Sequence, residues 1–272
     1  MDISRQCVPI KEAARISPKL GSKLKNGKID LGDSQALLEY NKAVLQIKFG
    51  LKIKVPPGHL IPTVCLRYAF IQEVIKSEQK VLEVGTGSSA ILAMIMGRIG
   101  CKVVATEANK ENFLFAQKNV ENNNLERLVE LRLCAPDEIL YNVVKENEVF
   151  DRIIAYPPQY SKSQPVRFHQ AQRGFGGDEL ELIGGREGFE FSMKLVQELV
   201  ESSVLASNGF LALLILNNEL VEKLITELRN MKWSYQILEV IAGTRQRYIV
   251  KTSPSIEITK FRQELENVFD NR

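Results

Sequence analysis

The stretch that decides the fold reads Lys80-Val-Leu-Glu-Val-Gly-Thr-Gly-Ser-Ser-Ala-Ile91. Its apolar run at residues 81–84 predicts a buried strand, which Gly85 and Gly87 interrupt. Ser88 and Ser89 can then cap a helix that continues to about residue 97. Two glycines let the backbone turn sharply and approach a ligand without a Cβ in the way. The stretch therefore predicts a strand, a tight ligand-binding loop and a helix.

A second strand is predicted at residues 102–106, and it ends immediately before Glu107. An acid at this place is positioned to accept hydrogen bonds from both ribose hydroxyls of a nucleoside cofactor. The spacing would also fit a nicotinamide dinucleotide, but the loop lacks the third glycine of the G-x-G-x-x-G pattern. Glu83, near the end of the first strand, is typical of enzymes that use S-adenosylmethionine. Together these residues favour a methyltransferase with S-adenosylmethionine as its cofactor.

The composition is that of an ordinary globular protein, with 44% hydrophobic and 25% charged residues. The length of 272 residues suits one large domain, or one domain with an appendage. No run of about eighteen apolar residues predicts a membrane span, and the first residues lack the apolar core of a secretory signal. We therefore expect a cytoplasmic protein with no membrane contact.

The four cysteines are scattered and form no C-x-x-C pair; they are Cys7, Cys65, Cys101 and Cys134. We therefore expect neither a disulfide framework nor a zinc site, in line with a reducing compartment. The sequence holds only two histidines, so we expect no histidine metal site and no bound metal.

Residues 1–55 are predicted to form a small helical module, followed by the catalytic domain at residues 56–272. Asp33 can cap a helix whose apolar residues repeat at roughly helical spacing as far as Ile47. The turn that follows, at residues 55–58, contains two prolines and a glycine, so it is a short connection and not a long linker.

Basic residues crowd this first module although the net charge of the chain is only +3. A solvated surface would explain any single lysine. The cluster as a whole equally suits contact with the phosphates of a nucleic acid. Within it, we expect Lys19, Lys23 and Lys25 to bind substrate phosphates.

Beyond residue 80 strands and helices alternate, as in a parallel, doubly wound α/β sheet. Strands are predicted at residues 81–84, 102–106, 129–133, 152–155 and 210–216, with a final hairpin of strands at 235–241 and 247–252. Helices are predicted at residues 64–77, 89–97, 110–122, from 137, 186–205 and 219–231. A seven-stranded sheet with a C-terminal β-hairpin is the layout of class I, Rossmann-like methyltransferases.

Ligands of open sheets bind at the carboxyl ends of the strands. By this assignment the loop at Gly85, Thr86 and Gly87 lies there, and so do Glu107 and Ala135. We expect these residues, together with Glu83, to line the cofactor site.

The predicted fourth strand ends in Tyr156-Pro157-Pro158-Gln159. Two consecutive prolines fix φ and remove two N–H donors, so the carbonyl groups of this loop have predictable directions. Methylation of an exocyclic amine needs such acceptors, because they must hold the amine hydrogens and direct the lone pair at the methyl group. It needs no strong general base, since positioning does most of the work. We therefore expect these four residues to position the acceptor.

The polar stretch at residues 164–185 is too long for an inert connection in a compact domain. A disordered surface loop is one interpretation. The other is a mobile substrate loop, in which Arg167 and Arg173 hold phosphates while His169 or Phe175 stacks on a base.

The chain resembles a known family of RNA methyltransferases in several segments. The matching segments are residues 49–67, 83–91, 105–108, 116–124, 176–177, 184–190 and 243–248, so the resemblance covers roughly residues 10 to 252. The family includes the eukaryotic adenine-N6 methyltransferase of spliceosomal small nuclear RNA and the bacterial adenine-N6 methyltransferase of large-subunit ribosomal RNA. The resemblance implies an S-adenosylmethionine-dependent enzyme that methylates adenine N6 in a structured RNA, either ribosomal or small.

The resemblance also implies roles for single residues. Arg67 matches the arginine that meets the methionine carboxylate of the cofactor, a task suited to a bidentate guanidinium. Gly85 and Gly87 match the cofactor loop, and Glu107 matches the acid that binds the ribose. The basic first module matches an RNA-binding region.

The chain departs from the family at the catalytic motif, where Asn-Pro-Pro-Phe is replaced by Tyr156-Pro157-Pro158-Gln159. Tyrosine has a hydroxyl but no carbonyl, and Gln159 cannot supply an aromatic face, for which the neighbouring Tyr160 is the candidate. Three interpretations remain: adenine N6 methylation in a rearranged pocket, methylation of another atom or base, or a catalytically silent RNA-binding protein. A protein glutamine amide is a further possible acceptor, because Asn-Pro-Pro-Tyr loops serve that reaction too.

Overall fold

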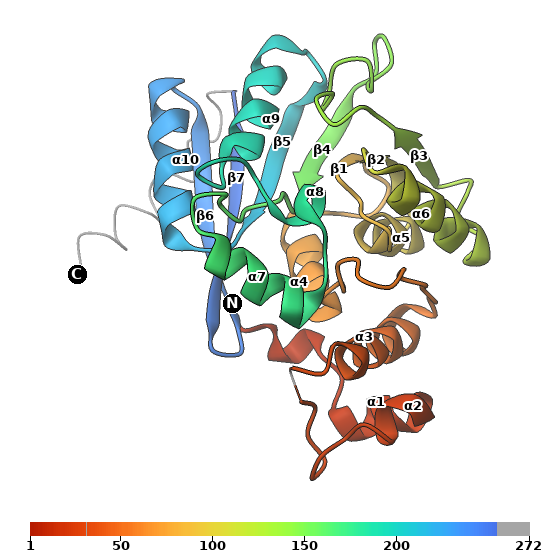
Figure 1. The fold of residues 1–272 in the computed structure, drawn as a ribbon. Helices are drawn as coiled ribbons and strands as arrows, with labels where there is room; N and C mark the ends of the chain where they lie inside the picture. The colour runs from red at the N-terminus through yellow and green to blue at the C-terminus, as the bar shows by residue number, and fades with distance from the viewer. Residues whose placement is uncertain (31, 255–272) are drawn as a thin grey trace.

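The computed structural model describes residues 1–30 and 32–254, which fold around a seven-stranded sheet (Figure 1). The strands are β1 (Lys80–Val84), β2 (Lys102–Glu107), β3 (Val129–Leu133), β4 (Phe150–Ala155), β5 (Leu205–Ile215), β6 (Ser234–Ala242) and β7 (Arg245–Ser253), in the order β3-β2-β1-β4-β5-β7-β6. Strands β1 to β5 pair in parallel, whereas β7 runs antiparallel to β5 and β6. The predicted class I methyltransferase fold with its terminal hairpin is confirmed.

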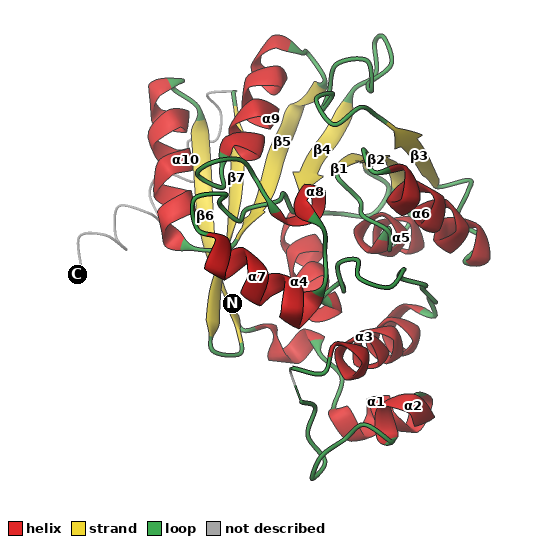
Figure 2. Cartoon of the chain, in the orientation of Figure 1, coloured by secondary structure: helices red, strands yellow, loops and turns green. Residues whose placement is uncertain are grey.

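Helices cover both faces of the sheet (Figure 2). One face packs against α4 (Val64–Val74), α5 (Ile91–Arg98) and α6 (Lys110–Asn122), and the other against α9 (Glu190–Glu201) and α10 (Asn218–Asn230). Successive side chains of a strand point to opposite faces of the sheet, so β1 contributes to both layers. Val81 packs in the core on the first face, and Leu82 and Val84 pack in the core on the second. Burial on both faces is the usual state of a parallel sheet.

The N-terminal residues pack against the first of these cores. They form the 3-10 helix η1 (Ile3–Gln6), α1 (Ile10–Ile16), α2 (Pro18–Gly21) and α3 (Ser34–Phe49). Leu20 and Leu45 are fully buried and share one core with Phe70 of α4. The predicted cap is confirmed, because Asp33 accepts a hydrogen bond from the backbone N–H of Ala36. The division at residue 55 stays a prediction.

A disulfide joins Cys7, next to η1, to Cys65 in α4. The Cα atoms of the two residues are 5.1 Å apart although 58 positions separate them in the sequence. The expectation that the scattered cysteines stay unpaired is therefore wrong for these two, because spacing along the chain says nothing about proximity after folding. Cys101 and Cys134 are free thiols.

The predicted serine cap of the helix after β1 is wrong. Ala90 occupies the N-cap position with φ 48°, α5 begins at Ile91, and among the described residues no side chain caps this helix. The hydroxyl of Ser88 is buried without a hydrogen-bond partner in the described part of the chain. Ser88 and Ser89 thus belong to the loop after β1, and the left-handed conformation of Ala90 separates this loop from α5.

The polar stretch before α9 is not a disordered loop. It contains α7 (Pro165–Phe175) and α8 (Glu179–Leu182). Pro165 suits the first position of a helix, and a capping box between Asp178 and Glu181 starts α8. The apolar periodicity that predicts a helix is weak here, because the buried residues of α7 are Phe168 and Ala171.

Two predicted helices also differ from the structure. No helix begins at residue 137, because residues 136–147 form turns that include Asn142 and Asn147 at positive φ. The helix expected at residues 186–205 is shorter: Gly188 has φ 87°, which keeps it out of the helix, so α9 begins two residues later. Within the described residues no helix is long and apolar enough to cross a membrane.

Candidate active site

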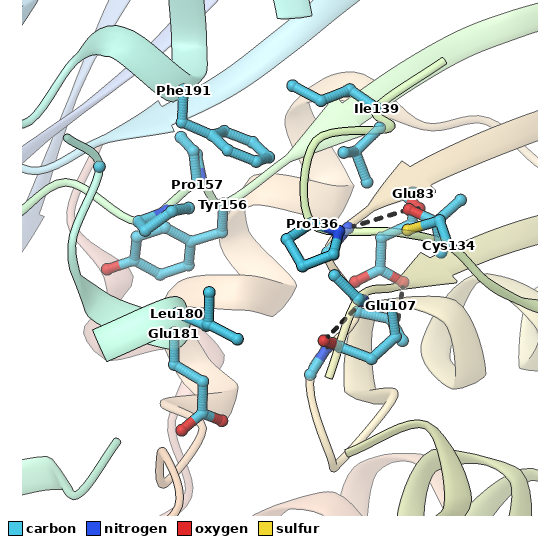
Figure 3. A pocket seen from close by; sticks show the side chains of 18 of the residues that line it. Glu83, Glu107, Cys134, Pro136, Ile139, Tyr156, Pro157, Leu180, Glu181 and Phe191 are labelled. Atoms are coloured by element: carbon cyan, nitrogen blue, oxygen red, sulfur yellow. Dashed lines mark hydrogen bonds between the residues drawn. The ribbon is translucent and has the colours of Figure 1, made fainter. Parts of the chain in front are cut away.

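A cavity of about 390 Å³ lies at the carboxyl ends of β1, β2 and β4 (Figure 3). The loop at residues 85–89 and Glu107 line one half. Tyr156, Pro157 and Phe191 line the other half. The volume falls in the range typical of small-molecule sites. The cavity therefore has room for a ligand between the loop after β1 and the Pro-Pro loop after β4.

The loop after β1 is held by Glu107. The carboxylate accepts hydrogen bonds from the backbone N–H groups of Gly87 (2.7 Å), Ala108 (2.9 Å) and Asn109 (2.8 Å). Gly85 and Gly87 have φ 75° and 66°, a conformation that favours glycine. Burial raises the pKa of the Glu107 carboxyl, while the hydrogen bonds from the backbone N–H groups lower it in part. The acid is thus fixed at the end of β2, where it lines the cavity.

Arg67 of α4 is a buried cation beside this loop. Arg67 lines the cavity and is only 9% exposed. Its guanidinium lies 4.9 Å from the centre of the Tyr156 ring. Within the described residues no carboxylate lies close enough to form a salt bridge with it. Burial lowers the pKa of the guanidinium, and the nearby Tyr156, Glu83 and Glu181 act in the opposite direction and raise it. A buried guanidinium without a close counter-ion fits the carboxylate of a ligand.

Glu83 lies at the base of the cavity, 1% exposed. Its carboxylate accepts a hydrogen bond of 3.0 Å from the hydroxyl of Thr86. Burial raises its pKa to about 7, against the opposing effects of Thr86 and Arg67. Ala135, after β3, reaches the same cavity between Cys134 and Pro136.

The structure therefore gathers every predicted cofactor residue around one cavity: Arg67, Glu83, Gly85, Thr86, Gly87, Glu107 and Ala135. Their contacts with a cofactor stay predictions.

Of the four residues predicted to position the acceptor, three line the cavity and one does not. Tyr156, Pro157 and Pro158 line it. Gln159 is turned away and only 5% exposed: its amide N–H₂ donates to the carbonyls of Pro157 (3.1 Å) and Leu214 (2.8 Å). Its amide oxygen accepts from the backbone N–H of Leu216 (2.7 Å). The expected direct contact between Gln159 and the acceptor is corrected to a supporting role, in which Gln159 fixes the loop to the end of β5.

A glycine-bearing loop before α9 packs directly on the Pro-Pro loop. A Cβ on Gly184 would lie 2.2 Å from the carbonyl oxygen of Pro158, and one on Gly188 would lie 2.6 Å from that of Gln159. The N–H of Gly184 donates to the carbonyl of Tyr160 (3.0 Å). The two loops therefore form one rigid wall, which requires glycine at Gly184.

The predicted substrate residues lie outside the cavity. Arg167, His169 and Arg173 are exposed on α7, while Phe175 packs against Leu37 and Leu38 of α3. Phe175 thus connects α7 to the N-terminal module rather than facing the cavity. A ligand that enters the cavity would meet these residues only by extending across the surface.

The lysines of the N-terminal module differ from one another. Lys23 forms an ion pair with Asp33 (3.1 Å) and Lys25 one with Asp30 (3.0 Å), whereas Lys19 is exposed at the end of α2. Surface ion pairs of this kind are weak, so both lysines remain able to meet a phosphate.

Sequence reasoning missed several residues of the cavity wall. Phe191 lies in the first turn of α9, and Leu180 and Glu181 lie in α8. The available signal was the apolar residue that follows a run of glycines at the start of a helix. Phe191 falls within the helix predicted at residues 186–205, whereas Leu180 and Glu181 fall within the stretch at residues 164–185 that was interpreted as a loop, and neither prediction placed these side chains at the cavity.

One group of possible metal ligands exists in the described residues. Ligand atoms of His59, Asp178 and Glu181 lie within 4.8 Å of one another. Both carboxylates already accept hydrogen bonds from backbone N–H groups as a capping box. The expectation that no metal is bound stays a prediction.

The sheet order, the glycine loop, the acid after β2 and the Pro-Pro loop define a class I methyltransferase. The chain belongs to the RNA methyltransferase family, whose model matches residues 19–253. It is 34% identical over 248 residues to MJ0046 of Methanocaldococcus jannaschii, a protein assigned as a methyltransferase; the match covers 86% of this chain and 90% of that protein.

Two eukaryotic relatives carry more specific names. One is the U6 small nuclear RNA (adenine-(43)-N(6))-methyltransferase of Schizosaccharomyces pombe, 25% identical over 84% of this chain and 62% of that protein. The other is the human RNA N(6)-adenosine-methyltransferase METTL16, 31% identical over 50% of this chain and 27% of that protein. The chain thus spans less than two thirds of the length of either.

Solved structures share the fold. The METTL16 catalytic domain in complex with a MAT2A 3′UTR hairpin has a TM-score of 0.81 at 21% identity, covering 92% of both chains. A methyltransferase from Pyrococcus furiosus has a TM-score of 0.66 at 30% identity, covering 80% of this chain and 96% of that one.

Proposed function

We propose that this protein transfers the methyl group of S-adenosylmethionine to the exocyclic N6 amine of an adenine in a structured RNA. The observation that carries the proposal is the cavity in which Arg67 and Glu107 face the Pro157–Pro158 loop. The family membership and the names of the eukaryotic relatives support the choice of RNA and of adenine N6.

The cofactor would bind in the half of the cavity next to β1 and β2. Arg67 would hold its carboxylate, since this guanidinium forms no salt bridge in the described residues. Glu107 would accept hydrogen bonds from the ribose hydroxyls, and Gly85 and Gly87 would let the backbone come close. When bound, S-adenosylmethionine supplies an electrophilic methyl group on a sulfonium.

The acceptor would bind against the Pro-Pro loop. The carbonyl of Pro157 accepts one hydrogen bond from Gln159 and keeps a second lone pair, which can hold a hydrogen of the incoming amine. The interlocked loops keep this carbonyl in place. The protein then needs only to align the amine with the methyl group.

RNA would reach the cavity across the basic N-terminal module and α7. Lys19, Lys23 and Lys25 on one side and Arg167 and Arg173 on the other offer positive charge for phosphates. We also propose a ribosomal or small RNA as substrate and a cytoplasmic location. The amide of a protein glutamine remains the alternative acceptor, and the basic residues favour RNA over it.

The test uses short RNA hairpins that carry one unpaired adenosine, each paired with a hairpin in which purine riboside replaces that adenosine. Purine riboside lacks the exocyclic amine but keeps the ring. With labelled S-adenosylmethionine, label should enter the adenosine hairpins and not their partners. Equal labelling of both members of a pair would contradict methylation of N6. Labelling of a glutamine peptide, with none in RNA, would favour the alternative.

A further inference from the structure

We propose that Phe191 supplies the aromatic surface on which the acceptor base stacks. The inference rests on the proposed function and assigns a role that the residues of the Pro-Pro loop do not fill. An enzyme that acts on an extruded base must hold the ring flat, and stacking on aromatic side chains does this. The position after Pro-Pro cannot serve here, because Gln159 is buried beneath its own loop.

The other aromatic rings of the predicted site are unsuitable. Tyr160, Phe175 and His169 do not line the cavity. Tyr156 lines it, but the guanidinium of Arg67 covers its ring at 4.9 Å. Figure 3 shows the Tyr156 hydroxyl directed away from Glu107. Among the described residues that line the cavity, Phe191 is therefore the aromatic residue whose ring is not already stacked on a cation.

The backbone fixes Phe191 in register with the Pro-Pro loop. Its N–H donates to the carbonyl of Gly184 at 3.2 Å. Gly184 in turn packs so closely on Pro158 that a Cβ would lie 2.2 Å from the Pro158 carbonyl oxygen. Phe191 thus keeps a constant position relative to the carbonyls that would hold the amine. In Figure 3 its ring projects into the cavity beside Pro157.

The surroundings of the ring suit a flat, uncharged acceptor. Leu180 and Ile183 also line the cavity, so a base on Phe191 would lie among apolar side chains with its amine edge toward Pro157. A planar nucleobase gains from stacking on Phe191, whereas the amide of a flexible glutamine side chain has little face to stack. The arrangement therefore favours a nucleobase as the acceptor class.

The test compares Phe191→Leu and Phe191→Tyr with the wild type, using the adenosine hairpins at saturating S-adenosylmethionine. Phe191→Leu keeps an apolar contact with the core but removes the flat face, so kcat/KM for the hairpin should fall about 10-fold or more. Phe191→Tyr should stay within about 3-fold of the wild type, because it keeps the ring. The Kd of S-adenosylmethionine, measured by calorimetry, should not change in either variant.

Phe189→Leu is the matched control. Phe189 lies next to the same helix start and stacks with Lys223 at 5.4 Å, but it does not line the cavity. Its replacement should leave kcat/KM for the hairpin within about 2-fold. If Phe189→Leu and Phe191→Leu lose activity equally, the effect belongs to the stability of α9 and the proposal is wrong.

A fluorescence measurement keeps the proposal testable without catalysis. The probe is a hairpin that carries 2-aminopurine in place of the unpaired adenosine, bound in the presence of S-adenosylhomocysteine. Wild type should quench its fluorescence more than Phe191→Leu does. Equal quenching, or a Kd for S-adenosylmethionine that rises in Phe191→Leu, would overturn the proposal. Methylation of a base at an atom other than N6 would overturn the proposed function and leave this stacking role intact.

Discussion

The guanidinium of Arg67 lies 4.9 Å from the centre of the Tyr156 ring. This contact joins the two halves of the cavity, since Arg67 comes from α4 and Tyr156 follows β4. By the resemblance described above, Tyr156 stands where the family motif has an asparagine, and its ring lies against a buried cation. The side chain of asparagine has no ring and cannot make this contact.

Replacement of Arg67 by lysine should weaken cofactor binding. Lysine keeps the charge but loses the bidentate geometry and the planar face that lies over Tyr156. Loss of charge-assisted hydrogen bonds worth about 1.5–3 kcal/mol should raise the Kd of S-adenosylmethionine by about 10-fold or more. Calorimetric titration measures this directly.

Arg152→Lys is the control for that variant, because Arg152 also lies over an aromatic ring, that of Phe210 at 4.0 Å, away from the cavity. The Kd of S-adenosylmethionine for Arg152→Lys should match that for the wild type. An unchanged Kd in Arg67→Lys would remove Arg67 from the cofactor site.

Glu83 should make the protein less stable as the pH rises. Burial raises its pKa from 4.5 to about 7, so between these values the folded chain binds a proton that the unfolded chain has lost. Stability contributed by the protonated carboxyl is therefore complete below about pH 4.5 and is lost as the pH passes about 7. The difference amounts to up to about 3 kcal/mol.

Denaturant unfolding at about pH 5 and about pH 8 measures this effect. Glu83→Gln removes the titrating group while keeping a similar shape, so its free energy of unfolding should fall less between the two values than that of the wild type. Parallel changes in both proteins would show that Glu83 is not responsible.

Replacement of Gly184 by alanine should separate the Pro-Pro loop from the loop before α9. The new Cβ would lie 2.2 Å from the carbonyl oxygen of Pro158, and neither backbone can yield without moving the other. Overpacking of this kind costs about 1–3 kcal/mol, and methyl transfer should fall with it because Pro157 and Phe191 shift apart. Thermal unfolding and a methyl-transfer assay report the two effects.

Gly174→Ala serves as the control, since a Cβ on Gly174 in α7 would meet no described atom within 4 Å. It should be neutral or slightly stabilising in thermal unfolding. If Gly184→Ala behaves in the same way, the close packing of the two loops is wrong.

The disulfide between Cys7 and Cys65 should stabilise the purified protein. It closes a loop of 58 positions, for which the chain-entropy estimate is about 4 kcal/mol. Cys7→Ser should therefore lower the free energy of unfolding by an amount of this order, and reduction of the wild type should lower it similarly. A thiol titration of the unfolded, unreduced chain should find two free thiols among the four cysteines. Four free thiols would contradict the pairing.

The strands were predictable because each is an apolar run bounded by turn signals. The loop at Gly85 and Gly87, with Glu107 after the next strand, located half of the cavity from the sequence alone. These features are local: each depends on residues within one strand and the loop that follows it.

The other half depends on contacts between distant segments, which no local pattern reveals. The side chain of Gln159 turns inward because the end of β5 offers it the carbonyl of Leu214, and the residue after the strand offers it the N–H of Leu216. Phe191 reaches the cavity because Gly184 packs on Pro158. The pairing of Cys7 with Cys65 likewise follows from the packing of η1 on α4.

The most direct test of the central claim is methyl transfer from labelled S-adenosylmethionine to total cellular RNA, followed by analysis of the nucleosides. We expect label in N6-methyladenosine, and a slower rate of labelling by Arg67→Lys and Phe191→Leu than by the wild type. Label in a different nucleoside, or none in RNA despite measurable binding of S-adenosylmethionine, would contradict the central claim.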